Sequence, residues 1–178
     1  MRRTDLEVTD RKHMREILED CPLVHLGLSD GSEPYVIPMN FGVEMDEQTC
    51  VFYFHCAREG RKLDIMAKNP RVCVEATIYT PRPRPEAGST EACCGREDAD
   101  RSGEAGGNGH RGHRGLRYQC VVATGTATIL EDEAERRAAL SALRRHNGRP
   151  DREESAERLA RLCLFKVVAD TITCKERG

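Results

Sequence analysis

The chain has 178 residues, 38% of them hydrophobic and 33% charged, with a net charge of −2. This size fits one domain, residues 1–178, and the near-neutral charge argues against nucleic acid or an anionic membrane as a partner. No segment is apolar for long enough to span a membrane, and the charged stretch from Met1 to Glu7 does not resemble a signal peptide, so we expect a soluble cytoplasmic protein.

The cysteines favour the same compartment. Their number, nine, is odd, and no two of them form a CxxC motif. Several lie inside apolar strand patterns, where cysteine behaves as a small hydrophobic residue. We therefore expect reduced thiols and no disulfide framework.

The first half of the chain reads as a helix followed by strands. Apolar residues at helical spacing predict a helix over 9–21, capped by Thr9 or Asp10. Strands are expected at 23–28, 34–43 and 50–56, with an Asp-Gly hairpin turn between the first two. A short helix over 60–68, ended by Asn-Pro, and an alternating strand over 71–79 complete this half.

The second half begins after a segment of unusual composition. Residues 81–115 contain no Val, Ile, Leu, Met, Phe, Tyr or Trp, so they cannot bury enough apolar surface to offset the entropy of ordering. We predict a flexible insertion there, within the single domain. Its Cys93, Cys94, His110 and His113 are metal-ligand types, but their spacing matches no zinc pattern, so no metal site is expected.

Strand and helix patterns resume after the insertion. A long strand is expected over 116–130, with a bulge or bend at Gly125. Acidic capping pairs predict two helices, from Asp132 to about His146 and from Asp151 to about Arg161. A last strand follows at 163–173. Six strands, several joined directly, predict a mainly β (α+β) fold, an antiparallel barrel with helices at its rim.

The strongest functional signal is the sequence Gly60-Arg61-Lys62 at the start of the short helix. The first turn of a helix has unpaired N–H groups and a positive dipole end, which together favour a phosphate. Adjacent cations at that end are unfavourable to the helix dipole and indicate that they bind an anion. An ordinary basic first turn explains them equally well.

Two other places could contact the same ligand. Asn40, beside Pro38 in a predicted edge strand, could offer amide donors and acceptors to a planar molecule, but a strand ending in a turn accounts for it as well. His55 ends a very apolar strand; it is a candidate catalytic residue, with a purely structural histidine as the alternative.

Three segments together resemble the FMN-binding split-barrel proteins of the pyridoxamine 5′-phosphate oxidase-like superfamily. They are most similar to its Nim-type branch, which is associated with 5-nitroimidazole resistance. The segments are PYVIPMNFG at 34–42, FYFHCAREGRKLD at 52–64 with NPRV at 69–72, and YQCVVATG at 118–125. The resemblance spans nearly the whole chain except the insertion.

The resemblance implies a six-stranded split barrel that forms a homodimer, with FMN in grooves between the subunits. Lys62 and Arg61 would hold the FMN phosphate, and Gly60 would leave space for it. The isoalloxazine ring would lie along residues 37–41, with Asn40 bonded to its polar edge. The residues expected to bind the cofactor are Ile37, Pro38, Met39, Asn40, Phe41, Phe54, His55, Gly60, Arg61, Lys62 and Cys120. Relatives often have Ser or Gln in place of Cys120, whose thiol is a poorer hydrogen-bond partner.

The implied function is that of an FMN-dependent oxidoreductase acting on a small molecule, with a nitroaromatic compound or a quinone as acceptor by analogy. Two alternatives stay open: a non-enzymatic protein of the same fold that stores flavin or binds haem through His55, and a deazaflavin-dependent reductase. A true pyridoxamine 5′-phosphate oxidase is disfavoured, because that family closes its site with a Trp-containing C-terminal segment and this chain has no Trp.

Overall fold

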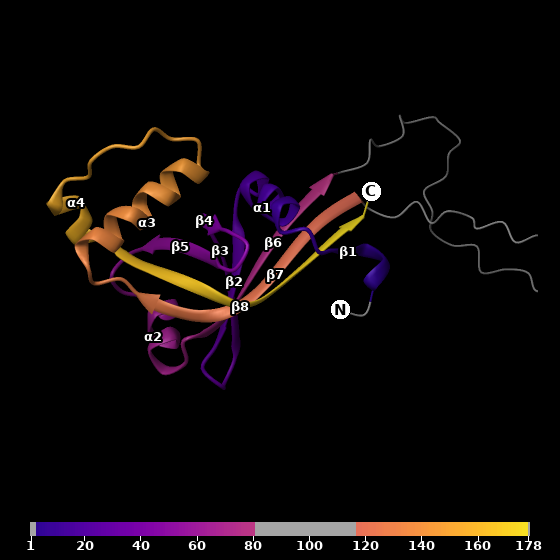
Figure 1. Cartoon of the computed structure of the whole chain (residues 1–178). Helices are drawn as coiled ribbons and strands as arrows, with labels where there is room; N and C mark the ends of the chain where they lie inside the picture. Colours follow the sequence, from indigo (N-terminus) through magenta and orange to yellow (C-terminus); the bar gives the residue numbers. More distant parts are fainter. Residues whose placement is uncertain (1–2, 81–116, 178) are drawn as a thin grey trace, which may run out of the picture.

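The computed structural model of the chain describes residues 3–80 and 117–177 (Figure 1). The predicted insertion at 81–115, with Cys93, Cys94, His110 and His113, lies outside the described residues. None of the described helices is long and apolar enough to cross a membrane.

The described residues form four α-helices and eight strands, with a short 3-10 helix at Thr4–Leu6. The helices are α1 (Arg11–Asp20), α2 (Arg61–Lys68), α3 (Glu133–His146) and α4 (Ala156–Arg161). The strands are β1 (Glu7–Val8), β2 (Val24–Ser29), β3 (Pro34–Met39), β4 (Gly42–Met45), β5 (Cys50–Cys56), β6 (Arg71–Thr80), β7 (Arg117–Ile129) and β8 (Cys163–Arg177).

All strands join one antiparallel sheet in the order β3-β2-β6-β7-β8-β5-β4, and β1 adds to β8. The two ends of this path, β3 and β4, are consecutive in the chain and separated only by Asn40 and Phe41, yet they are not paired with each other. The sheet therefore curls into a barrel that stays open between β3 and β4. This confirms the predicted split barrel with rim helices.

The structure has two more strands than the sequence predicted. The extra ones are β1, which is only two residues long, and β4, which arises because the single strand expected at 34–43 is divided at Asn40–Phe41. The division has a physical basis, because the chain must leave one end of the curled sheet and enter the other at this point.

The core fills the inside of the barrel and continues under α3. The larger cluster includes Leu26, Val74 and Phe52 from the strands and Leu18 from α1, all of them 0–1% exposed. The smaller cluster joins α3 and α4 to β8 through residues such as Leu164.

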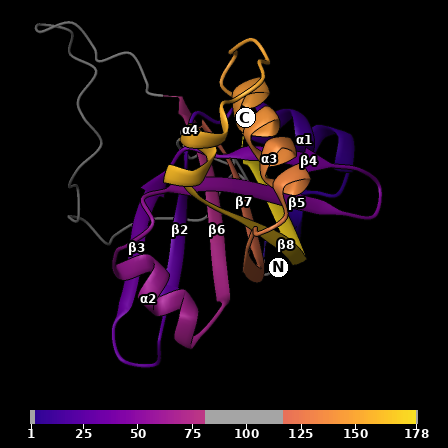
Figure 2. The ribbon, with the colours of Figure 1, turned by 90° about the vertical axis from the view of Figure 1, so that its left-hand side faces the viewer.

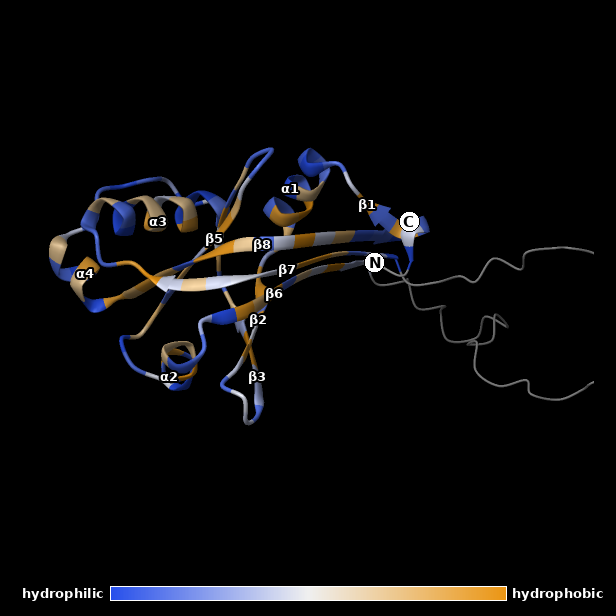
Figure 3. Ribbon diagram, turned by 60° about the horizontal axis from the view of Figure 1, so that its bottom comes forward, coloured by the Kyte–Doolittle hydropathy of each residue, from blue (hydrophilic) through white to orange (hydrophobic). Residues whose placement is uncertain are grey.

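Figure 3 shows α1 and α3 on one side of the long strands, α2 on the other and α4 near the strand ends. Both α1 and α2 bury side chains in the larger cluster. The opposite face of β3, β2, β6 and β7, which carries Val36, Gly27, Cys73 and Thr124, is partly exposed, and we call it the uncovered sheet face.

Most predicted helix starts are confirmed, and one is wrong. Asp10 caps α1 by accepting from the Lys12 N–H, and Asp132 caps α3 by accepting from the Glu135 N–H. The helix expected from Asp151 instead begins at Ala156, with Ser155 as its cap. The Asp151 carboxylate accepts from the Ser141 hydroxyl, and Glu154 is buried among arginines, so neither is free to cap a helix.

The predicted irregularity at Gly125 is confirmed as a shift in the register between β7 and β8, located between Thr124 and Gly125. A Cβ atom at Gly125 would come within 2.1 Å of the Val168 carbonyl oxygen, so the two backbones approach too closely for any side chain. Glycine is required here because it lets β8 bend across β7.

His146 at the end of α3 should make stability depend on pH. Its Nε2–H donates to the Cys21 carbonyl at 3.0 Å, whereas its buried Nδ1 has no hydrogen-bond partner among the described residues. Burial lowers the pKa of this ring below the ordinary value of about 6.5. Below that pH the His146 ring is protonated in the unfolded chain but still neutral in the folded chain. The free energy of unfolding should therefore fall as the pH drops through 6.5.

The measurement is denaturant unfolding between pH 5 and 8 for the wild type and for His146→Gln, which keeps the donor to Cys21 but cannot titrate. The variant should lose less stability at low pH. His13→Gln should change the profile in the opposite direction, because Glu176 raises the pKa of His13 and its contribution is lost as the pH rises. Equal pH profiles for wild type and His146→Gln would contradict this account.

Candidate functional site

A groove of about 450 Å³ opens where the barrel is split. Its walls come from the end of β3, the end of β5, the start of α2 and the residue that precedes β8. Figure 2 shows β3 and α2 beside each other at this side of the sheet. The lining residues are Ile37, Pro38, Met39, Asn40, His55, Cys56, Ala57, Lys62 and Leu162.

The groove brings together six of the residues that the sequence singled out: Ile37, Pro38, Met39, Asn40, His55 and Lys62. They come from three segments that are separated along the chain. Cys56, Ala57 and Leu162 also line it but were not predicted. Cys56 and Ala57 follow His55 directly and could have been included, whereas no local pattern could have placed Leu162 there.

Lys62 brings positive charge to one part of this groove. Its side chain is half-buried, and no carboxylate lies within ion-pair distance of it among the described residues. Gly60 precedes the helix with a φ of +139°, a conformation that side chains disfavour, and there is open space where its Cβ would be. The N–H groups of Arg61 and Lys62 begin the helix and have no carbonyl one turn earlier to bond. This corner therefore has the shape and charge to receive an anionic group.

Arg61 lies apart from the groove. Its guanidinium bonds the Glu33 carboxylate at 3.3 Å and lies 4.9 Å from the centre of the Tyr35 ring, both on the β2–β3 hairpin. It would have to leave Glu33 to reach a phosphate above Gly60. In this structure Lys62 is the cation that faces the groove.

Phe41 and Phe54 are fully buried beneath the groove and do not line it. Phe41 packs on His146, with ring centres 4.0 Å apart, and Phe54 stacks on Phe165 at 4.9 Å. Because side chains alternate along a strand, burial of Phe54 turns its neighbour His55 toward the opening. The two phenylalanines thus support the groove wall from the core.

His55 connects the groove to a second, smaller pocket. Nearby protein atoms exclude water from part of its ring, which lowers the pKa of His55, and the positive charges of Arg158 and Arg149 lower it further. Its imidazole is consequently neutral at pH 7 and can accept a proton. Asn40 also borders both cavities.

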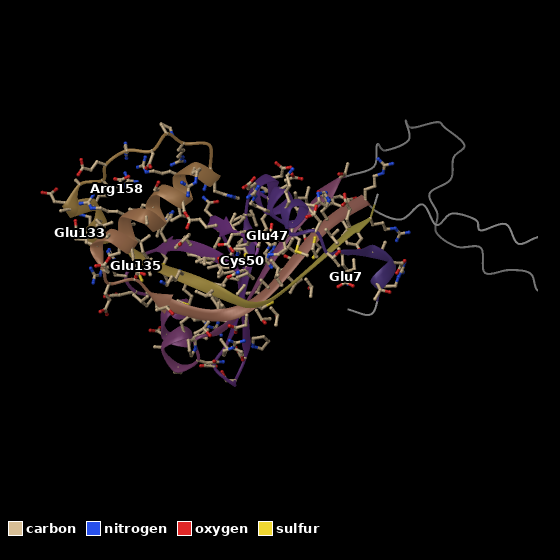
Figure 4. All side chains as sticks on the ribbon, viewed as in Figure 1. Glu7, Glu47, Cys50, Glu133, Glu135 and Arg158 are labelled. Atoms are coloured by element: carbon tan, nitrogen blue, oxygen red, sulfur yellow. The ribbon has the colours of Figure 1, made fainter. Side chains whose placement is uncertain are left out.

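The second pocket, of about 90 Å³, has an excess of positive charge. Buried Glu154 pairs with Arg144, with Arg152 at 3.4 Å and with Arg158 at 3.3 Å. Arg149 also lines this pocket and has no carboxylate within ion-pair distance among the described residues. Figure 4 shows Arg158 at α4, on the outside of the fold. The region beside His55 can therefore attract a negative charge.

Cys120 lies on the sheet face away from the core, outside the groove of its own chain. Pro38, His25 and Glu75 are register partners across β3, β2 and β6. Cys120 pairs with Thr77, which lies two residues beyond Glu75 along β6. Three strand spacings of about 4.8 Å separate β7 from β3, so Cys120 lies roughly 14 Å from the groove wall. Its thiol contacts Glu75 at 3.6 Å.

A larger cavity of about 660 Å³ lies on the other side of Leu162, between α2, the end of β7 and α4. Its walls are mostly apolar and include Leu63, Met66, Ile129 and Cys163. No sequence pattern indicated it, because its walls come from segments that meet only in the folded barrel. Leu162 lines both cavities.

Comparison with known proteins gives a consistent result. Residues 10–81 match the family model described as pyridoxamine 5′-phosphate oxidase. None of the curated proteins matches the sequence significantly. The fold is similar to a candidate 5-nitroimidazole antibiotic resistance protein from Bacteroides thetaiotaomicron, with a TM-score of 0.71 and 22% identity over 96% of this chain and 86% of that one.

Two further solved structures share the fold. A FAD-binding protein from Mesorhizobium loti has a TM-score of 0.59 and 18% identity, and covers 95% of this chain and 96% of its own. The flavocytochrome Anf3 from Azotobacter vinelandii has a TM-score of 0.67 and 18% identity over 100% of this chain and 72% of its own. Together with the open antiparallel barrel, these likenesses show that the chain has the split-barrel fold, and its residues 10–81 are similar to the pyridoxamine 5′-phosphate oxidase family.

Proposed function

We propose that the protein is an FMN-dependent oxidoreductase that acts on a small molecule in the cytoplasm. The observation that supports this most is the single groove that places Lys62 beside the helix start at Gly60 and has Asn40 and His55 in its wall. A phosphate would bind Lys62 and the first N–H groups of α2, and the ring system would lie against Ile37, Pro38 and Met39.

A bound flavin would supply the two-electron chemistry, and the protein would supply position and charge. The Asn40 amide can donate to a ring oxygen and hold the ring in register. His55, neutral at pH 7, can hold or accept a proton beside it. Arg149 and Arg158 would stabilise the negative charge that develops on an acceptor's oxygen atoms. This favours acceptors such as nitroaromatic compounds and quinones, in which reduction places charge on oxygen.

We further propose that two copies of the chain form the working unit. One row across the uncovered sheet face consists of small, uncharged residues: Val36, Gly27, Cys73, Thr124 and Thr171. Val36 is 63% exposed and lies in β3, at one edge of the sheet. A second copy packed on this face would cover the row and could bring its Cys120 toward the groove. Neither nucleic acid nor a membrane is an expected partner.

The test is reconstitution of the purified chain with FMN, FAD, a deazaflavin and haem in separate titrations. FMN should bind at one molecule per chain, seen as quenched flavin fluorescence and a shifted visible spectrum. A chemical reductant should bleach the bound flavin, and a nitroaromatic compound or a quinone should restore its colour. Failure of FMN to bind at micromolar concentration would refute the proposal.

Haem binding is the second candidate, because His55 lies exposed in a groove and can offer a neutral ring nitrogen to iron. The similarity to a flavocytochrome adds weight to it. Haem bound through His55 should give a sharp absorbance band near 400 nm that changes position in His55→Ala. Tight deazaflavin binding with weak FMN binding would instead favour the deazaflavin-dependent reductase.

A further inference from the structure

Two cysteines face each other at the wall of the groove. Cys56 is the last residue of β5, Cys163 is the first residue of β8, and the antiparallel register pairs them directly. The two thiols lie close enough for Cys163 to contribute to the raised pKa of Cys56, and both side chains are partly exposed. Among the described residues no other two cysteines are register partners.

Direct pairing in an antiparallel register is compatible with a disulfide. Directly opposed residues on antiparallel strands have Cα atoms about 4.5–5.5 Å apart, and disulfides join residues whose Cα atoms are about 4.4–6.8 Å apart. Opposed side chains also point to the same face of the sheet. A bond between the two sulfur atoms would therefore need rotation of the side chains and no movement of the backbone.

The pair is reachable from two cavities. Cys56 lines the groove together with Lys62, and Cys163 lines the larger apolar cavity on the other side of Leu162. Burial raises the pKa of the Cys56 thiol to about 11, and the charge of Lys62 offsets this only in part. At neutral pH the thiol form dominates, so the pair should react slowly and survive in the reduced form until a suitable oxidant enters.

We propose that Cys56 and Cys163 form a reversible dithiol–disulfide site that exchanges with low-molecular-weight disulfides. One cysteine, as thiolate, attacks a sulfur of the small disulfide and releases one small thiol. The second cysteine then attacks the mixed disulfide, forms the Cys56–Cys163 bond and releases the other small thiol. The protein loses two protons and two electrons, and the small disulfide gains them to become two thiols. This site goes beyond the proposed flavin chemistry and does not depend on it.

The experiment equilibrates the folded full-length chain, without added flavin, in buffers of varied reduced to oxidised glutathione ratio. Thiols are then blocked, the chain is digested without reduction, and the linked peptides are identified by mass. We expect a peptide that joins Cys56 to Cys163, increasing with the oxidised fraction and reversed by excess reduced glutathione. Two thiols per chain should disappear together.

Three variants sharpen the test. In Cys163→Ser, Cys56 should instead retain one glutathione as a mixed disulfide, and Cys56→Ser should trap Cys163 in the same way. Cys73→Ser, on the uncovered sheet face, should leave the linked peptide unchanged. The proposal is overturned if the folded wild type forms no link between Cys56 and Cys163 at any ratio, or forms it only after unfolding in denaturant.

Discussion

Replacement of Lys62 by methionine should weaken FMN binding about a hundredfold, the largest functional effect that we expect from a single substitution. Loss of a partly buried charge that pairs with a phosphate typically costs about 2–5 kcal/mol, and a hundredfold change in Kd corresponds to about 2.8 kcal/mol. Methionine keeps much of the length and apolar character of the lysine stem, so the groove wall should keep its shape. Fluorescence titration with FMN measures the change.

Lys68 offers a matched control on the same helix. It carries the same charge at the opposite end of α2, where it pairs with Asp30 at 3.0 Å and faces away from the groove. Lys68→Met should change FMN affinity by less than about twofold, because Lys68 does not line the groove and exposed charges are screened by solvent. If both variants bind FMN equally well, the phosphate does not lie at the start of α2.

Replacement of Glu154 by glutamine should produce the largest loss of stability. The carboxylate is only 7% exposed and balances three arginines, which would repel one another without it. Breaking a buried ion pair by removing one partner typically costs about 3 kcal/mol or more, which corresponds to a fall in Tm of roughly 6–12 °C for a chain of this size. Calorimetry or thermal unfolding measures the fall.

Glu153 provides the comparison, because it is exposed and immediately precedes Glu154 in the chain. Glu153→Gln removes the same charge and should shift Tm by about 1 °C at most. The same pair of variants also separates stability from function, since Glu154 orients Arg158 toward the pocket beside His55. Equal melting temperatures would show that the arginines find other partners.

Much of the fold could be predicted because its signals are local. β5 was predicted to the residue from its dense run of β-formers, and the start of α3 from the carboxylate of Asp132. The helix predicted from Asp151 failed for a tertiary reason. Asp151 and Glu154 have the spacing of a capping pair, but two side chains of α3 bind their carboxylates instead: the Ser141 hydroxyl donates to Asp151, and the Arg144 guanidinium pairs with Glu154. Sequence spacing does not reveal that competition.

The site was predictable in part for the same reason. Lys62 and Gly60 belong to a helix start whose chemistry is local, and Asn40 follows the end of a strand two residues after Pro38. Leu162 could not be predicted, because it reaches the groove only through the pairing of β5 with β8. Phe41 and Phe54 were expected to touch the cofactor, and their burial below the groove follows from the alternation of side chains along their segments.

The open side of the barrel has a consequence for the lifetime of the protein in a cell. A molecule seated in the groove would touch β3 and β5, which belong to opposite ends of the strand path, and would join them where no backbone hydrogen bond does. Binding would then oppose separation of the two ends. It would raise the free energy of unfolding by about 2.7 kcal/mol when the free ligand concentration is a hundred times Kd. The empty protein would be degraded sooner by proteases than the loaded one, so the supply of cofactor would set its abundance.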